Sequence, residues 1–185
     1  MHINYLPSIG YFQQMLADDN STLHLADRYI RKSLRNRTYI LGANGKLILS
    51  IPTTKLGDDS RMFEHIELSY AENWQKQHWK SIQSAYRRSP YFEFYEDYFL
   101  KFYSEQGYQY LWEFNYELIL LIIKLLKIEK TIILNREETF NKPNEYNLVK
   151  PCEYQQVFVN KLPFVENLSI IDLIFNKGPQ SKIYI

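Results

Sequence analysis

This chain of 185 residues contains little cysteine and little glycine, and neither sign of charge is in clear excess. The single cysteine, Cys152, excludes a disulfide within the chain. Only 6 glycines occur, and they form no glycine-rich phosphate loop. The 22 basic and 21 acidic residues give a formal net charge of +1, whereas a dedicated nucleic-acid-binding domain is usually strongly basic. The composition therefore argues against nucleic acid as the partner.

Long hydrophobic runs and metal-binding motifs are also missing. The longest apolar stretch, 118–123, ends at Lys124 and is far shorter than the roughly 20 residues of a membrane span. The first residues lack the basic start and apolar run of a secretory signal, so we expect a cytoplasmic location. No two histidines have the i, i+4 spacing of a helical zinc site, and no metal site is predicted. The four histidines are His2, His24, His65 and His78.

Aromatic residues are abundant, with 16 Tyr, 11 Phe and 3 Trp. Such rings can line a ligand site, but they bury large apolar area first, and we expect most of them in the hydrophobic core. A chain of this length can bury roughly 70% of the surface that it exposes when unfolded, so one core is sufficient. We expect a single domain spanning residues 1–185.

Periodicity and turn signals predict an α/β domain. We expect a small mixed sheet, three central helices packed against it and a short C-terminal helix. Asn44-Gly45 indicates a hairpin, and Asn115 is a candidate helix cap. The predicted strands are 1–5, 21–25, 37–41, 46–51, 131–134 and, weakly, 63–68; the predicted helices are 9–16, one after Ser69, one after Ser89-Pro90, 116–127 and one from Ser169 to Gly178; a long loop is predicted at 135–149.

The sharpest local feature is a run of five cations within ten residues. Guanidinium groups match phosphate or carboxylate oxygens in pairs, so the run is a candidate anion site. A solvated face, or pairing with carboxylates of the same chain such as Asp27, is the alternative. The cations are Arg28, Arg31, Lys32, Arg35 and Arg37.

Three further features are candidates for the site. Pro7 to Phe12 forms a turn into a predicted helix, where backbone amides can hold an anion, although a plain structural turn has the same pattern. His78 can act as a catalyst or, since it shares a helical face with Trp74, as a core histidine. Asp172 can take a proton or only cap its helix.

Four stretches together resemble the WbqC-like protein family, in the compact form of Bacteroidetes-type bacteria. They are Tyr5-Leu6-Pro7-Ser8-Ile9-Gly10-Tyr11-Phe12, residues 29–37 from Tyr29 through Arg35-Asn36-Arg37, residues 79–92 ending in Arg87-Arg88-Ser89-Pro90-Tyr91-Phe92, and residues 167–179. Some members of this family are encoded among O-antigen genes, and transfer of glycine or another aminoacyl group onto a polysaccharide precursor has been suggested for the family. The resemblance therefore implies such a role for this chain. This chain differs from the family pattern at Arg28, where Gln is usual, and at Leu34, where an aromatic residue is common.

With the resemblance, we expect a transferase that acts on an activated sugar in surface polysaccharide biosynthesis. Arg31, Lys32, Arg35 and Arg37 would bind the anionic donor or acceptor, beside Tyr29 and the amides of Ser8, Gly10 and Tyr11. Asn36 would orient a carbonyl or hydroxyl, and Asp172 or His78 would take a proton. The alternative is a non-catalytic module that binds an anionic saccharide, a nucleotide or an acidic partner. The sequence names no cofactor, and it does not define the oligomeric state.

Overall fold

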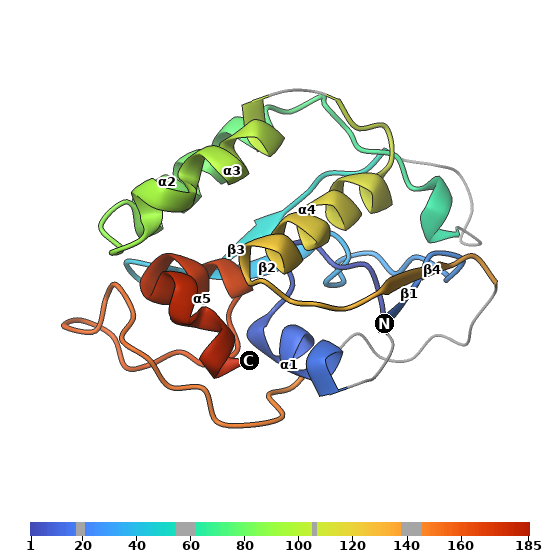
Figure 1. Ribbon diagram of the computed structural model, residues 1–185. Helices are drawn as coiled ribbons and strands as arrows, with labels where there is room; N and C mark the ends of the chain where they lie inside the picture. The colour runs from blue at the N-terminus through green and yellow to red at the C-terminus, as the bar shows by residue number, and fades with distance from the viewer. Residues whose placement is uncertain (18–20, 55–61, 105–106, 138–145) are drawn as a thin grey trace.

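The computed structural model describes residues 1–17, 21–54, 62–104, 107–137 and 146–185. These ranges contain five α-helices, four β-strands and two short 3₁₀ helices, Phe63–His65 and Gly178–Tyr184 (Figure 1). The helices are α1 (Ile9–Ala17), α2 (Trp74–Tyr86), α3 (Phe92–Ser104), α4 (Leu111–Leu125) and α5 (Ile170–Lys177); the strands are β1 (Ser21–His24), β2 (Arg37–Gly42), β3 (Gly45–Ser50) and β4 (Ile132–Asn135).

The strands form two pairs, one parallel and one antiparallel. β1 pairs with β4 in parallel, with Ser21 opposite Ile132, and β2 and β3 form an antiparallel hairpin. The hairpin closes with Gly42 opposite Gly45, and Gly45 has a φ of 107°, which a residue without a side chain adopts readily. The predicted α/β class is confirmed, with helices α2 and α3 packed together and α2 resting on β2.

Aromatic rings from separate elements meet around α4. The ring of Phe114 lies between 5.3 and 6.2 Å from five other rings. Most of these contacts are edge-to-face, the arrangement in which the positive edge of one ring meets the negative face of another. The five rings are those of Tyr5, Trp74, Phe102, Tyr103 and Tyr108.

The N-terminal segment before α1 is held between β2 and α5. The carbonyl of Leu6 accepts hydrogen bonds from the Thr38 hydroxyl at 2.8 Å and the Ser169 hydroxyl at 2.9 Å. Leu6 has a φ of 38°, an unusual value for a bulky residue, and the two hydrogen bonds hold it there. The predicted C-terminal helix is therefore part of the same hydrophobic core as the N-terminal segment.

Three local expectations are wrong. Residues 1–5 form no strand, and only an isolated bridge pairs His2 with His24. Residues 63–65 form a 3₁₀ helix rather than the start of a strand over 63–68. Helix α4 begins at Leu111, one turn before the predicted cap at Asn115, because the Glu113 carboxylate accepts the Tyr110 amide 3.3 Å away and starts the helix there. Asn115 is consequently buried inside the helix, and its side-chain nitrogen donates to the Arg35 carbonyl at 2.7 Å.

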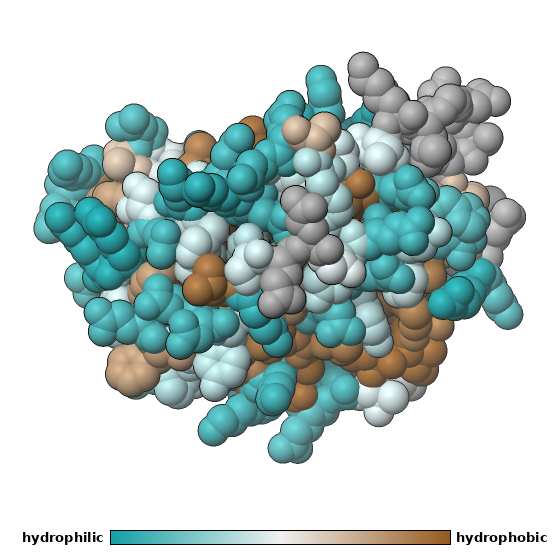
Figure 2. Space-filling view, turned by 90° about the horizontal axis from the view of Figure 1, so that it is seen from above, coloured by the Kyte–Doolittle hydropathy of each residue, from teal (hydrophilic) through white to brown (hydrophobic). Residues whose placement is uncertain are grey.

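The predicted loop at 135–149 falls partly outside the described residues. Its described end lies against α1, where the Gln13 side chain accepts from the Val149 amide at 2.8 Å. In the described part of the chain, none of the helices has the length and apolar character needed to cross a membrane. Seen from above, hydrophilic side chains cover most of the molecular face, and hydrophobic side chains gather toward one edge (Figure 2).

Candidate functional site

Arg35 points into the protein, and only 1% of its surface is exposed. Tight turns before β2 direct it inward, since Lys32 has a φ of 59° and the Asn36 amide donates to the Ser33 carbonyl at 3.2 Å. The Tyr5 amide donates to the Leu34 carbonyl at 3.0 Å and ties this segment to the N-terminal residues before α1. The local chain therefore presents Arg35 to the core and not to solvent.

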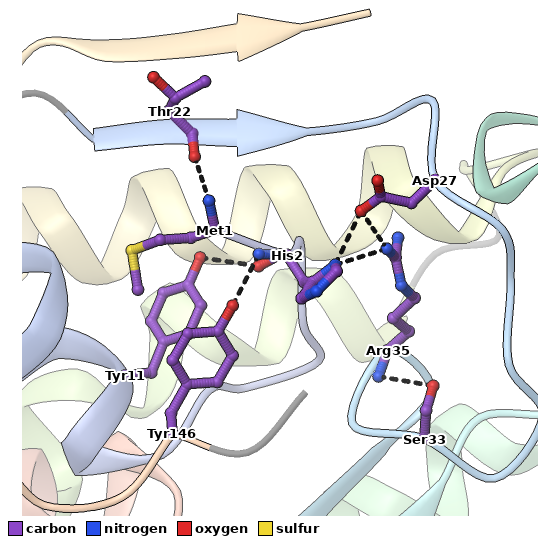
Figure 3. A network of polar contacts seen from close by, with 8 residues as sticks. All are labelled: Met1, His2, Tyr11, Thr22, Asp27, Ser33, Arg35 and Tyr146. Atoms are coloured by element: carbon purple, nitrogen blue, oxygen red, sulfur yellow. Dashed lines mark hydrogen bonds and ion pairs between the residues drawn. The ribbon is translucent and has the colours of Figure 1, made fainter. Parts of the chain in front are cut away.

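Arg35, Asp27 and His2 meet at one buried point (Figure 3). The Arg35 Nη2 donates to Asp27 Oδ2 at 2.6 Å and lies 2.7 Å from His2 Nδ1, which is itself 2.8 Å from the same carboxylate oxygen. Burial lowers the pKa of Arg35, and the neighbouring Asp27 charge opposes that shift. One carboxylate oxygen thus serves both basic side chains.

Two tyrosines hold His2 in position through its backbone. The His2 amide donates to the Tyr146 hydroxyl at 2.8 Å, and the Tyr11 hydroxyl donates to the His2 carbonyl at 2.9 Å (Figure 3). The two rings pack edge-to-face with centroids 4.7 Å apart. Burial raises the pKa of Tyr146 to about 12, so its hydroxyl stays neutral at physiological pH.

Most of the Arg35 guanidinium has no hydrogen-bond acceptor among the described residues. Its Nε and Nη1 atoms are both buried and both unpartnered, and together they carry three N–H groups. The Phe63 ring lies under the guanidinium, 4.1 Å from Cζ, and stacks on Tyr29 with centroids 6.2 Å apart. A cation–π contact satisfies the face of the guanidinium but not its N–H edge. These N–H groups can donate to oxygen atoms, although in this structure they are closed to solvent.

The pKa of the Tyr29 phenol is affected by several cations of the basic run. Burial raises the pKa of its phenol, while a hydrogen bond with Thr53 and the charges of Arg31, Arg35 and Arg37 lower it. The charges of these three arginines thus oppose the effect of burial on the Tyr29 phenol.

Arg37 lies beside a narrow cleft that Ser8 also lines. The cleft has a volume of about 20 Å³, enough for one group of the size of a water molecule. Arg37 Nε and Asn4 Oδ1 are buried without hydrogen-bond partners among the described residues, and both residues line the cleft. Asn167 closes it from the C-terminal side, with a φ of 52°.

The amides at the start of α1 are already used by the chain itself. The Gly10 amide donates to Asn167 Oδ1 at 2.9 Å, and the Tyr11 amide donates to the Ser8 carbonyl at 3.2 Å. A side chain at Gly10 would lie 2.6 Å from the Tyr146 carbonyl oxygen, so close packing explains the glycine. This helix start contributes Ser8 to the cleft, and its amides serve the fold.

The four predicted cations do not share one direction. Arg31 and Lys32 are exposed, Arg37 is half-buried and Arg35 is buried. Asn36 is buried, donates to the Ile51 carbonyl at 3.0 Å and keeps an unpartnered Oδ1 atom. The predicted cations therefore do not converge on one surface: Arg35 lies with Asp27 and His2 in the interior, and Arg37 lines the narrow cleft.

Comparison with protein-family models gives a match to the WbqC-like protein family over residues 3–153. The chain belongs to this family. Comparisons with curated proteins and with solved structures give no significant match. The matched range of the WbqC-like chain contains Asp27, Tyr29, Arg35 and Arg37, and it ends before α5.

Asp172 of this WbqC-like protein lies in a separate buried cluster. Its Oδ2 accepts from the Tyr154 hydroxyl at 2.5 Å and from Gln156 Nε2 at 3.2 Å, and the Tyr86 hydroxyl also bonds the carboxylate. Burial raises the pKa of Asp172, and these three hydrogen bonds reduce the shift. Asp172 shares none of these partners with the arginine cluster, and its carboxylate holds the Tyr154 and Gln156 side chains in place.

His78 lies in the aromatic core, as the alternative interpretation of its helical face predicts. The Tyr5 hydroxyl is 3.0 Å from its Nδ1, and the ring also hydrogen-bonds the Ser50 backbone. Burial lowers the pKa of His78 to about 4. The imidazole is therefore neutral at physiological pH, with a partner from Tyr5 on one side and from Ser50 on the other.

Sequence reasoning missed His2, Tyr146 and Asn115 as neighbours of Arg35. Asp27, eight residues before Arg35, was recognisable as an internal counter-charge to the basic run. His2 and Tyr146 are separated by 144 positions, and no local spacing connects them. Only the folded chain brings these residues to one place.

Proposed function

We propose that this protein is a transferase of surface polysaccharide biosynthesis, which moves glycine or another aminoacyl group onto an activated sugar. Arg31, Arg35 and Arg37 bind the phosphate or carboxylate of the donor or acceptor, and Tyr29 hydrogen-bonds the same group. Family membership supports the reaction class as a proposal, and the buried cations support the charge of the ligand. The cytoplasm, where activated sugars are made, is the proposed location.

The unpartnered guanidinium N–H groups of Arg35 are the observation that carries this proposal. A hydrogen bond from a charged donor contributes roughly 1.5 to 3 kcal/mol, and a buried donor without a partner is costly. Asp27 neutralises one edge of the guanidinium and leaves the Nε and Nη1 groups for a ligand oxygen. Arg37 Nε, also unpartnered, adds a further donor at the start of β2.

A non-catalytic binding module is the second candidate function. One observation favours it: Asp172 and His78, the two candidate proton acceptors, have hydrogen-bond partners in clusters separate from Arg35. A module would hold an anionic saccharide, a nucleotide or an acidic protein segment with the same arginines. Binding and turnover measurements on the same variants separate the two functions.

The direct test titrates the full-length protein with inorganic pyrophosphate and with UDP-glucose by isothermal calorimetry. Saturable binding is expected, and R31Q/R37Q should weaken it at least about tenfold, because two charge-assisted contacts are lost. Arg88, exposed at the end of α2, provides the matched control R88Q, which should bind as the unaltered chain does. Equal binding by both variants would refute the arginine site.

Turnover is measured with activated glycine, supplied as its acyl adenylate, and a nucleotide sugar as acceptor. Formation of an aminoacyl sugar that depends on Arg31 and Arg37 supports the transferase. Binding without product across a panel of activated amino acids and sugars supports the module instead. DNA binding with steep salt dependence, in place of either result, would indicate a nucleic-acid partner.

A further inference from the structure

A second, larger cavity lies at the other end of β2. Leu41, near the end of that strand, forms one wall, and the segment 153–164 forms the rest. The cavity has a volume of about 440 Å³, within the usual range for small-molecule sites. None of the residues that line it belongs to the arginine cluster.

Three aromatic side chains, Tyr154, Phe158 and Phe164, line the cavity. The rings of Tyr154 and Phe164 are nearly perpendicular, with an interplanar angle of 81° and centroids 5.5 Å apart. The π faces of such rings carry partial negative charge, which attracts cations and C–H groups.

Buried hydrogen bonds fix these walls before any ligand arrives. The Gln156 side chain donates to the Val165 carbonyl at 2.8 Å and accepts from the Val165 amide at 3.0 Å, which closes the segment on itself. Asp172 accepts from Tyr154 and Gln156 together. The polar atoms of Tyr154 and Gln156 are thereby occupied, and the aromatic walls are held in place.

Glu153 and Gln155 are the polar side chains that remain for a ligand. Both are exposed, both line the cavity, and neither makes a side-chain hydrogen bond to the described residues. Glu153 is the one charged residue in the lining, as far as the described chain shows. The cavity therefore combines aromatic walls with a single negative charge.

This combination selects among ligand classes. An anion is repelled by Glu153, and a purely apolar molecule gains nothing from that carboxylate. A saccharide can hydrogen-bond Glu153 and Gln155, but as a neutral molecule it gains less than a cation does from the Glu153 charge. A quaternary ammonium group has no hydrogen-bonding groups to satisfy, and its methyl groups, which share the positive charge, can pack against aromatic faces.

We propose that this cavity binds a small organic cation of the alkylammonium class. The methyl groups pack against Tyr154, Phe158 and Phe164, and Glu153 supplies the counter-charge. The site is independent of the arginine cluster and of the proposed transferase activity.

The test compares choline with 3,3-dimethyl-1-butanol, a neutral molecule of nearly the same shape, in NMR titrations of the full-length protein. Choline should bind saturably and at least about tenfold more tightly than the neutral isostere, because only choline gains the cation–π and carboxylate contacts. Equal affinity of the two molecules, or no saturable binding of choline, would overturn the proposal. Preferential binding of N-acetylglucosamine would overturn it in favour of a saccharide site.

Two variants locate the binding. E153Q changes an exposed side chain without altering the core, and F164A removes one aromatic wall; each should weaken choline binding at least about fivefold. F94A, which removes a ring that is 71% exposed on α3, is the matched control and should leave choline affinity unchanged. If F164A unfolds the segment, E153Q alone decides, and an unchanged affinity in E153Q refutes the site.

Discussion

The Arg35 guanidinium and the Asp27 carboxylate form an ion pair that is almost entirely removed from water. Nη2 lies 2.6 Å from Oδ2, and the two side chains are 1% and 0% exposed. His2 Nδ1 lies 2.8 Å from the same oxygen, so the N-terminal segment is joined to the pair. The site and the anchoring of the N-terminal segment therefore depend on one carboxylate.

Removing either partner of this pair should strongly destabilise the chain. R35M leaves the Asp27 charge buried without its cation, and D27L leaves the Arg35 charge buried without its anion. Each variant should lower the free energy of unfolding by about 3 to 5 kcal/mol. The double variant should be much less destabilised than the sum of the two. Urea unfolding of the unaltered chain, the two single variants and the double variant measures the coupling between the two side chains. Strict additivity would show that the two side chains do not interact.

Glycine at position 10 should be required by packing. A Cβ atom there would lie 2.6 Å from the backbone oxygens of Tyr146 and Asn147, so G10A forces that segment away from α1 and should cost about 1 to 3 kcal/mol. G107A is the matched control, because nothing lies within 4 Å of a Cβ at Gly107. Thermal unfolding should show a clear loss for G10A and little change for G107A. Similar midpoints for the two variants would contradict the packing argument.

Much of the secondary structure could be predicted from short-range sequence signals. Asn44-Gly45 predicts the hairpin because the turn needs a residue that accepts a positive φ, and Gly45 has one. The spacing of apolar residues predicts helices where α1 and α5 are found. The start of α4 could not be predicted in the same way, since Tyr110 is an uncommon cap residue and the first-turn Glu113 supplies the decisive hydrogen bond.

The candidate site could be predicted only in part. The density of cations identified the segment that carries Arg35 as a candidate, but the direction of each side chain depends on turns and on distant partners. Arg35 turns inward because Asp27, Phe63 and His2 receive it, and two of these three are far from it in sequence. Periodicity places residues on a face of one element, and it carries no information about which remote element covers that face.

Replacing Asp172 by asparagine should change how stability depends on pH. Burial raises the pKa of Asp172, so the folded chain binds the proton more tightly than the unfolded chain does. Stability therefore falls as pH rises from about 4 toward the raised pKa, and D172N removes this loss. The stability of D172N relative to the unaltered chain should increase over that interval in urea unfolding.

Asp97, which is exposed on α3, provides the control for this measurement. D97N should show no comparable gain as the pH rises. A difference between D172N and the unaltered chain that stays constant with pH would mean that Asp172 is ionised equally in both states. That result would show that burial does not raise the pKa of Asp172.

His78 should give the opposite pH dependence. Burial lowers its pKa to about 4, against an ordinary value of about 6.5, so the unfolded chain binds the proton more tightly. The stability that neutral His78 contributes is complete above about pH 6.5 and is lost as the pH falls toward 4, a change on the order of 3 kcal/mol. H78Q keeps a hydrogen-bonding side chain without titration and should flatten the unfolding free energy over this interval. H65Q, at a side chain that is 70% exposed, should follow the unaltered chain. A profile for H78Q as steep as that of H65Q would show that the imidazole is not held neutral between Tyr5 and the Ser50 backbone.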